Sequence, residues 1–464
     1  MQQLSPDMTE RYEIEDRRPD CARALMLGAD QLMLGCAAPL LDEARVGAVC
    51  VLDAADKLAA QGGMYTLLLR GEAEDGTIIR EERVIQSILR ACAPEKDFDD
   101  IMAFAGRDMS LLIMSAQADA TYLALAARAC YEAWQCRNVL PEILIFSEHP
   151  EDDCARLRLE AMATLARGWT KGMDFAAALL QANAQAVLAD RLCAALSGSD
   201  LATARREMNY RDDFIAWAEP ENRCVFEKAA PELLKNVATD ADFAEARTAG
   251  LRVLDALIFL CTGIGYLAGK HSFSQVLADE TLRGFIGRAF MQEVLPELPL
   301  EKEAATRAVI AAFSRLENRQ NDMALTVIGR GLIRGFSKSV LPAIRARAER
   351  EFEAPKYLTF ALAAVVMLYA GARPDAKGQW EVARGEERDP IYDDPEVLSV
   401  FATLSHDMPA ETLCYAVLAD RTLWGEDLRE IPGLEMQLCF DISAIQRTGF
   451  MDTLRRIDEQ NPVC

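Results

Sequence analysis

The sequence has few histidines and no closely spaced pair of cysteines. Only His149, His271 and His406 occur in 464 residues. None of them lies at ligand spacing from a cysteine, so a metal site is not expected. The thirteen cysteines are scattered through apolar segments, no CxxC pair occurs, and the closest two are Cys130 and Cys136. This pattern predicts reduced, buried thiols rather than disulfides.

Positive charge and long apolar runs are also scarce. The chain has 50 Lys and Arg against 73 Asp and Glu, a net charge of −23, which argues against nucleic acid and anionic membranes as partners. The apolar stretch 358–370 is only about a dozen residues long, too short to span a bilayer. The N-terminal segment lacks the basic-then-apolar order of a signal peptide. We therefore expect a cytoplasmic protein with no nucleic-acid or membrane partner.

Length and periodicity predict two domains. In residues 1–240, short apolar runs alternate with helical stretches, which predicts an α/β domain with a mostly parallel sheet. In residues 241–464 the periodicity is helical except in the polar stretch 371–394, which predicts an all-helical domain. The candidate strands are 23–27, 46–52, 64–70, 77–84, 110–114 and 142–146.

A glycine follows the first candidate strand, as in dinucleotide-binding turns. Gly28 stands at the first position of a G-x-G-x-x-G-like pattern, but Asp30 occupies the position of the second glycine. That glycine lets backbone N–H groups approach a pyrophosphate, whereas an aspartate places a carboxylate near the anion-binding end of the next helix. Asp53 ends the second strand, where an aspartate either binds a ribose diol or caps a helix. Gly28 and Asp53 are the candidate cofactor-binding residues.

Several segments resemble one enzyme family in order and spacing. They are 61–71 (QGGMYTLLLRG), 81–85 (EERVI), 190–192 (DRL), 219–220 with Glu227, 265–269 (GYLAG), 293–296 (EVLP), 340–342 (VLP) and 360–364 (FALAA). On these residues the chain resembles the tagaturonate reductases (altronate oxidoreductases) of the long-chain mannitol dehydrogenase family. The resemblance implies a Rossmann-like domain that binds NAD, followed by a helical domain. It also implies hydride transfer between the nicotinamide and a carbon of a sugar acid or polyol.

The resemblance further implies a catalytic helix, and this chain has replaced its key residues. The family signature is K-x4-N-x2-H, in which the lysine is the general acid/base and the other two orient the substrate oxygen. Offsets of five and eight residues place all three side chains toward one face of a helix. In the segment 248–263 (TAGLRVLDALIFLCTG), these positions hold Gly250, Asp255 and Ile258. No catalytic residue is therefore assigned there.

Other polar positions of the family are changed as well. The family's G-x-G-N/V-F-x-R start corresponds to 28–34, which lacks the second glycine and the arginine. A family asparagine corresponds to Ala186, and an asparagine–glycine pair corresponds to Asp153 and Cys154. The family's N-S-x-S-K-F-R segment reads 331–337 and keeps only the phenylalanine. Apolar scaffold positions match while polar site positions do not, which indicates relaxed selection on a site within a retained fold.

Three basic positions are alternatives to the missing lysine. Lys270, beside a histidine, is either a solvated side chain or a relocated acid/base. Lys338 lies four residues after Arg334, as on an exposed basic face. Arg252 either contacts an anionic group or forms a salt bridge with Asp255.

Two hypotheses follow from these replacements. In the first, the chain is a catalytically silent relative that serves as a binding, regulatory or partner subunit, with a protein partner or a sugar-acid or polyol ligand. In the second, it is an active NAD(H)-dependent oxidoreductase on a sugar acid or polyol, such as tagaturonate/altronate, with a rebuilt site.

Overall fold

The computed structural model divides into two compact units, Met1–Arg247 and Thr248–Cys464. It describes the chain except residues 1, 9–13, 73–76, 149–152, 171–173, 190–197, 221–223, 238–241, 318–323, 329–330, 385–386 and 460–464. The segment 190–192 and the domain boundary at 240/241, both expected from the sequence, lie outside the described residues. All eleven described cysteines are free thiols, and eight of them are buried.

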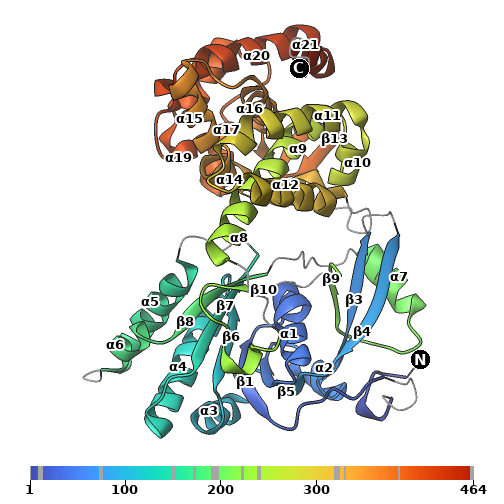
Figure 1. Cartoon of the computed structure of the whole chain (residues 1–464), viewed down its shortest axis with the longest axis vertical. Coiled ribbons are helices and arrows are strands. Elements are labelled where there is room, and N and C mark those ends of the chain that lie inside the picture. The colour runs from blue at the N-terminus through green and yellow to red at the C-terminus, as the bar shows by residue number, and fades with distance from the viewer. Residues whose placement is uncertain are drawn as a thin grey trace. The chain divides into compact units, whose positions relative to one another are not determined.

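A seven-stranded sheet forms the centre of the N-terminal unit (Figure 1). Its strand order is β10-β8-β7-β6-β1-β2-β5, and every neighbouring pair is parallel except β10 with β8. The strands are β1 (Ala22–Leu27), β2 (Gly47–Val51), β5 (Ile88–Cys92), β6 (Leu111–Ser115), β7 (Glu142–Ser147), β8 (Ala184–Ala189) and β10 (Cys224–Phe226). β2 and β6 are buried along their whole length, as expected for a parallel sheet that helices cover on both faces.

Alternate residues of each strand supply two cores, one on each face of this sheet. In β1, Ala24 and Met26 pack into one core, and Leu25 and Leu27 pack into the other. The helices of the unit are α1 (Ala38–Glu43), α2 (Ala55–Ala60), α3 (Phe98–Arg107), α4 (Ala120–Arg137), α5 (Cys154–Arg167), α6 (Phe175–Leu180) and α7 (Gly198–Glu207). This architecture confirms the predicted α/β fold class with a mostly parallel sheet.

A second sheet of three strands completes the N-terminal unit. It has the order β4-β3-β9, from β3 (Tyr65–Glu72), β4 (Ile78–Ile85) and β9 (Ile215–Ala218). The buried carboxylate of Asp212 accepts hydrogen bonds from Thr66 N at 2.6 Å and Gln61 Nε2 at 2.7 Å. These bonds fix the approach to β9 and, with it, the position of Phe214.

The C-terminal unit is built mainly from helices around one core. At its centre, α9 (Asp255–Leu267) packs against α16 (Lys356–Tyr369), and every residue of α16 from Tyr357 onward is buried. The other long helices are α11 (Glu280–Ala289), α12 (Lys302–Glu317), α15 (Leu341–Glu351), α18 (Ala410–Ala419), α20 (Leu434–Thr448) and α21 (Phe450–Glu459). Shorter ones are α8 (Phe243–Ala249), which crosses the boundary of the two units, α10 (Phe273–Ala278), α13 (Leu325–Ile328), α14 (Leu332–Ser339), α17 (Pro395–Phe401) and α19 (Arg421–Trp424).

The prediction that this unit is purely helical is wrong in one detail. A three-stranded antiparallel sheet is formed by β11 (Arg373–Pro374), β12 (Trp380–Arg384) and β13 (Glu387–Pro390). The polar composition of 371–394 concealed this sheet from a reading by periodicity, because among the described residues of the segment only Ala372, Val382 and Ile391 are buried and apolar. Gly378, with φ +81°, makes the turn between the first two strands.

One helical run, Phe243–Leu267, is long and apolar enough to cross a membrane by length and composition. However, 75% of its most apolar window is buried inside the protein. Its apolar residues therefore have a packing role, which is typical of a core helix.

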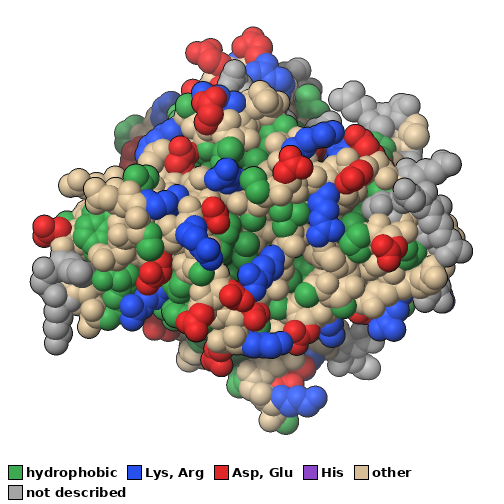
Figure 2. Space-filling model, turned by 90° about the horizontal axis from the view of Figure 1, so that it is seen from below, with side chains coloured by type: hydrophobic (Ala, Val, Ile, Leu, Met, Phe, Trp, Pro, Cys, Tyr) green, Lys and Arg blue, Asp and Glu red, His purple; other side chains and the backbone are tan. Residues whose placement is uncertain are grey.

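The surface charges are mixed in sign on the face shown in Figure 2. Among the described residues of this face, acidic and basic side chains are interspersed and do not gather into an extended basic patch. Together with the net charge of −23, this distribution does not favour binding of a polyanion there.

Candidate ligand pocket and the helix of the family signature

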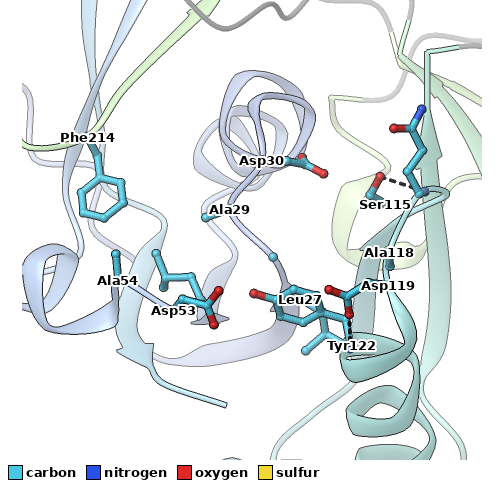
Figure 3. Close-up of a pocket in the computed structure, with 13 residues that line it drawn as sticks. Leu27, Ala29, Asp30, Asp53, Ala54, Ser115, Ala118, Asp119, Tyr122 and Phe214 are labelled. Atoms are coloured by element: carbon cyan, nitrogen blue, oxygen red, sulfur yellow. Dashed lines mark hydrogen bonds between the residues drawn. The ribbon is translucent and has the colours of Figure 1, made fainter. Parts of the chain in front are cut away.

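A pocket of about 380 Å³ lies in the N-terminal unit, at the carboxyl ends of β1, β2 and β6 (Figure 3). The chain leaves β1 toward β2 on one side, while β6 pairs with β1 on the other. Ligands of open α/β sheets bind at such a switch point. The lining residues are Leu27, Gly28, Ala29, Asp30, Leu52, Asp53, Ala54, Ser115, Gln117, Ala118, Asp119, Tyr122 and Phe214.

Gly28 makes the turn that opens this pocket. Its φ is +92°, a backbone conformation that favours glycine. Its N–H donates to the carbonyl of Val51 at 2.9 Å, which ties the turn to the neighbouring strand. The predicted role of Gly28 in shaping a tight turn after β1 agrees with this geometry.

Asp30 caps the helix that follows the turn. Its Oδ1 accepts the N–H of Met33 at 2.8 Å, and its carbonyl accepts the N–H of Leu34 at 2.9 Å. The N-terminus of this helix lies beside the pocket and is the positive end of the helix dipole. The carboxylate of Asp30 therefore partly neutralises its charge.

Asp53 is exposed and its carboxylate points into the pocket (Figure 3). The sequence left open whether it caps a helix, and it does not: the N-cap of α2 is Ala54, without a side-chain hydrogen bond. Tyr122, on the first turn of α4, directs its hydroxyl toward this carboxylate. Burial, and then the charge of Asp53, raise the pKa of Tyr122 to about 12.

The charge of the pocket is negative. Its lining contains three carboxylates, those of Asp30, Asp53 and Asp119, and no lysine, arginine or histidine. Asp119 caps α4 by accepting the N–H groups of Thr121 and Tyr122 at 2.8 and 3.1 Å. Two helix N-termini thus meet the pocket, and each carries its own acidic cap.

The sequence predicted only Gly28 and Asp53 of this pocket as site residues. Ser115, Gln117 and Tyr122 were missed, because the sequence does not tell which strand lies beside β1. The apolar run 110–114 could have indicated them, because it predicts a parallel strand. Residues that directly follow parallel strands lie at the same edge of the sheet, here the edge where β1 ends.

The positions of the family signature lie in the C-terminal unit. Gly250 is the first residue of a π-helical turn, η4 (Gly250–Leu254), and Asp255 and Ile258 follow in α9. Asp255 is half-buried and accepts a hydrogen bond from the Ser339 hydroxyl at 3.3 Å. Burial raises the pKa of Asp255 to about 7, against the lowering effects of Ser339 and Lys338.

The basic alternatives to the missing lysine are engaged elsewhere or exposed. Lys270 forms an ion pair with Asp279, 2.9 Å from Nζ to Oδ2. Arg334 and Lys338 are both exposed on α14, as the basic-face interpretation expected. In the described part of the chain Arg252 forms no ion pair with Asp255, so that alternative is wrong. Of these basic residues, Lys338 lowers the pKa of Asp255 by its charge.

The residues at the other positions matched to polar family residues make local structural contacts. The N–H of Ala186 in β8 donates to Glu227 Oε2 at 3.0 Å. Asp153 adopts a φ of +61° before α5 and pairs with Arg156 at 2.5 Å. Burial raises the pKa of the Cys154 thiol to about 11, so it is a poor nucleophile. None of these contacts points to a reacting group.

Known proteins resemble this chain over most of its length. No sequence model of a protein family matches it. An altronate oxidoreductase of Klebsiella pneumoniae (strain 342) is 24% identical over 431 residues, 86% of this chain and 87% of that protein. One from Pectobacterium carotovorum is 25% identical over 427 residues, covering 84% and 86%. The resemblance to the tagaturonate reductases of the mannitol dehydrogenase family is confirmed.

Solved structures of mannitol dehydrogenase type share the fold. Mannitol 2-dehydrogenase of Pseudomonas fluorescens, a ternary complex with NAD and D-mannitol, superposes with a TM-score of 0.73 at 15% identity, covering 99% of this chain and all of that one. A D-sorbitol dehydrogenase in substrate-free form gives 0.71 at 15% identity, covering 97% and 100%. The mannitol dehydrogenase fold therefore extends over both units of the chain.

Proposed function

We propose that the chain is a catalytically silent relative of the altronate oxidoreductases. The observation that carries this proposal is the helix of the signature, where Gly250, Asp255 and Ile258 replace a proton-transferring lysine and two orienting side chains. Glycine has no proton to give, and isoleucine cannot hydrogen-bond a substrate oxygen. The apolar face of the same helix is packed in the core, so the fold survives without the chemistry.

The residues of the pocket do not fit the NAD of the family. Asp53 suits a ribose diol, since its carboxylate faces the pocket at the end of β2. Asp30 does not suit a pyrophosphate, because its carboxylate takes the N–H of Met33 that an anion would need. No cation in the lining offsets this charge. Binding of NAD is therefore not part of the proposal.

The proposed role is that of a cytoplasmic binding, regulatory or partner subunit. Similar proteins are oxidoreductases named for altronate, mannitol and sorbitol, so a sugar acid or polyol is a candidate ligand and a protein is a candidate partner. Neither nucleic acid nor membrane is proposed as a partner, in line with the net charge of −23.

An NADH oxidation assay with tagaturonate, fructuronate and fructose tests the proposal, with an altronate oxidoreductase run in parallel. We expect no turnover above the protein-free rate for a preparation shown to be folded by circular dichroism. A rate that is proportional to protein concentration with any of the three would contradict the proposal.

The second candidate function is an active oxidoreductase with a rebuilt site. One observation favours it: Asp255 is half-buried at the position of the family asparagine, and its pKa of about 7 suits a group that both gives and accepts a proton. This candidate predicts that the chain oxidises NADH in the assay and that Asp255→Asn abolishes the activity. It also predicts that the activity of the unmodified chain changes with pH around 7. NAD or NADH would then also raise the melting temperature.

A further inference from the structure

We propose that the pocket at β1, β2 and β6 binds an uncharged compound with a vicinal diol and a flat ring, a nucleoside, and rejects phosphate-linked dinucleotides. This inference goes beyond the proposed silence, because it names what the pocket binds. It rests on the side chains that line the pocket (Figure 3).

Asp53 supplies the recognition of the diol. In the part of the chain that the structure describes, its carboxylate makes no hydrogen bond or ion pair, and α2 begins without using it as a cap. A carboxylate accepts two hydrogen bonds side by side from adjacent hydroxyl groups. The carboxylate faces the pocket, so both of its oxygens are available to such a ligand.

The exclusion of phosphate comes from Asp30 and Asp119. A phosphate at a sheet edge is usually held by free N–H groups at a helix N-terminus. Here the N–H groups of Met33, Thr121 and Tyr122 are already taken by the carboxylates of these two aspartates. A phosphate would therefore meet two negative charges where it needs donors, and the pocket lining offers it no cation.

The walls of the pocket favour a flat, largely apolar group beside the diol. Ala54 and Phe214 lie on the side of Asp53, and Ala118 lies on the opposite side next to Tyr122 (Figure 3). Leu52 also lines the pocket. Gln117 adds an exposed amide that can both donate and accept a hydrogen bond. A volume of about 380 Å³ falls within the range of small-ligand sites. A linear polyol shares the diol but leaves the apolar walls unused.

Isothermal titration calorimetry with adenosine, ADP, NAD and D-mannitol tests the proposal. We expect adenosine to bind the unmodified chain, with ADP and NAD at least tenfold weaker. Asp53→Asn should weaken adenosine at least tenfold. Asp99→Asn, which removes an exposed carboxylate from α3 of the same unit, is the matched control and should leave binding unchanged.

A gain of binding provides the sharper test. Asp30→Gly removes the carboxylate, frees the N–H of Met33 and restores the glycine of the dinucleotide turn. ADP and NAD should then bind at least tenfold more tightly than to the unmodified chain, while adenosine changes little. A purely structural role of Asp30 predicts no such gain.

Three results would overturn the proposal. One is NAD binding to the unmodified chain as tightly as adenosine does. Another is the absence of binding by both adenosine and D-mannitol. The third is binding of D-mannitol without adenosine, which would assign the pocket to a polyol. Turnover of a sugar acid with NADH requires the dinucleotide to bind and would count against both proposals. NAD binding without turnover would overturn only this inference, so the two failures can be told apart.

Discussion

The Ser339 hydroxyl donates a hydrogen bond to Asp255, with 3.3 Å between Ser339 Oγ and Asp255 Oδ2. This bond joins the end of α14 to the start of α9. It favours the charged carboxylate, as does Lys338, but burial outweighs both and raises the pKa to about 7.

The titration of Asp255 should make stability depend on pH. Its pKa is higher in the folded than in the unfolded chain, so the folded chain holds the extra proton and the free energy of unfolding falls as pH rises from about 4 to 7. The slope from this group is at most about 1.4 kcal/mol per pH unit. Asp255→Asn should flatten the curve and be the more stable form at pH 8. Urea unfolding from pH 4 to 8 measures this, and Asp452→Asn, at an exposed aspartate of α21, should keep the slope.

Asp441 offers a second test of buried charge, in a different helix. It is fully buried in α20, only one of its oxygens has a partner, and burial raises its pKa to about 8. Asp441→Asn removes the cost of ionising this group while keeping the acceptor for Gln437. The melting temperature at pH 8.5 should rise, and the difference should shrink below pH 5. A lower melting temperature at pH 8.5 would contradict the assignment.

Two glycines of the C-terminal unit should respond to alanine in opposite ways. A Cβ at Gly263 would lie 2.7 Å from Val365 Cγ2 and 3.1 Å from Val365 N, so Gly263→Ala should push α9 away from α16 and cost about 1–3 kcal/mol. A Cβ at Gly287 in α11 would meet nothing within 4 Å, so Gly287→Ala should stabilise by about 0.5–1 kcal/mol. Chemical denaturation of both variants checks the prediction, which fails if their effects have the same sign.

The cap at Asp30 should be measurable by itself. Asp30→Ala removes the acceptor for the N–H of Met33 and should lower the free energy of unfolding of the N-terminal unit by about 1 kcal/mol. Asp30→Gly should lower it by only about 0.3 kcal/mol. Hydrogen exchange of the Met33 amide reports the change locally. Equal protection of this amide in the parent and in Asp30→Ala would show that the cap contributes nothing.

Much of the fold could be predicted, because buried parallel strands leave a clear mark in sequence. The runs 46–52 and 110–114 are apolar almost throughout, and they became β2 and β6. The strand order could not be predicted, since it depends on which runs lie side by side. For the same reason Gly28 and Asp53 were found as separate candidates, while Tyr122 and Phe214 were not connected with them.

The small sheet β11–β13 shows a different limit of sequence reasoning. Its strands lie in a polar stretch and are held by few buried side chains, of which Val382 is the most deeply buried. Cross-strand pairing, rather than a hydrophobic pattern, defines such strands. Periodicity therefore indicates only a break in the helical region.

The two sides of α9 differ in how deeply they are buried. Phe259 packs against Phe336 with ring centroids 4.8 Å apart, and Gly263 lies against α16. A substitution on this side therefore changes the packing of the core of the C-terminal unit. Asp255 and Ile258 are only half-buried, so substitutions at these two positions should disturb the core less than substitutions at Phe259 or Gly263. In a helix of this kind, residues at the half-buried positions can be exchanged at little cost in stability, while the fully buried side remains constrained by packing.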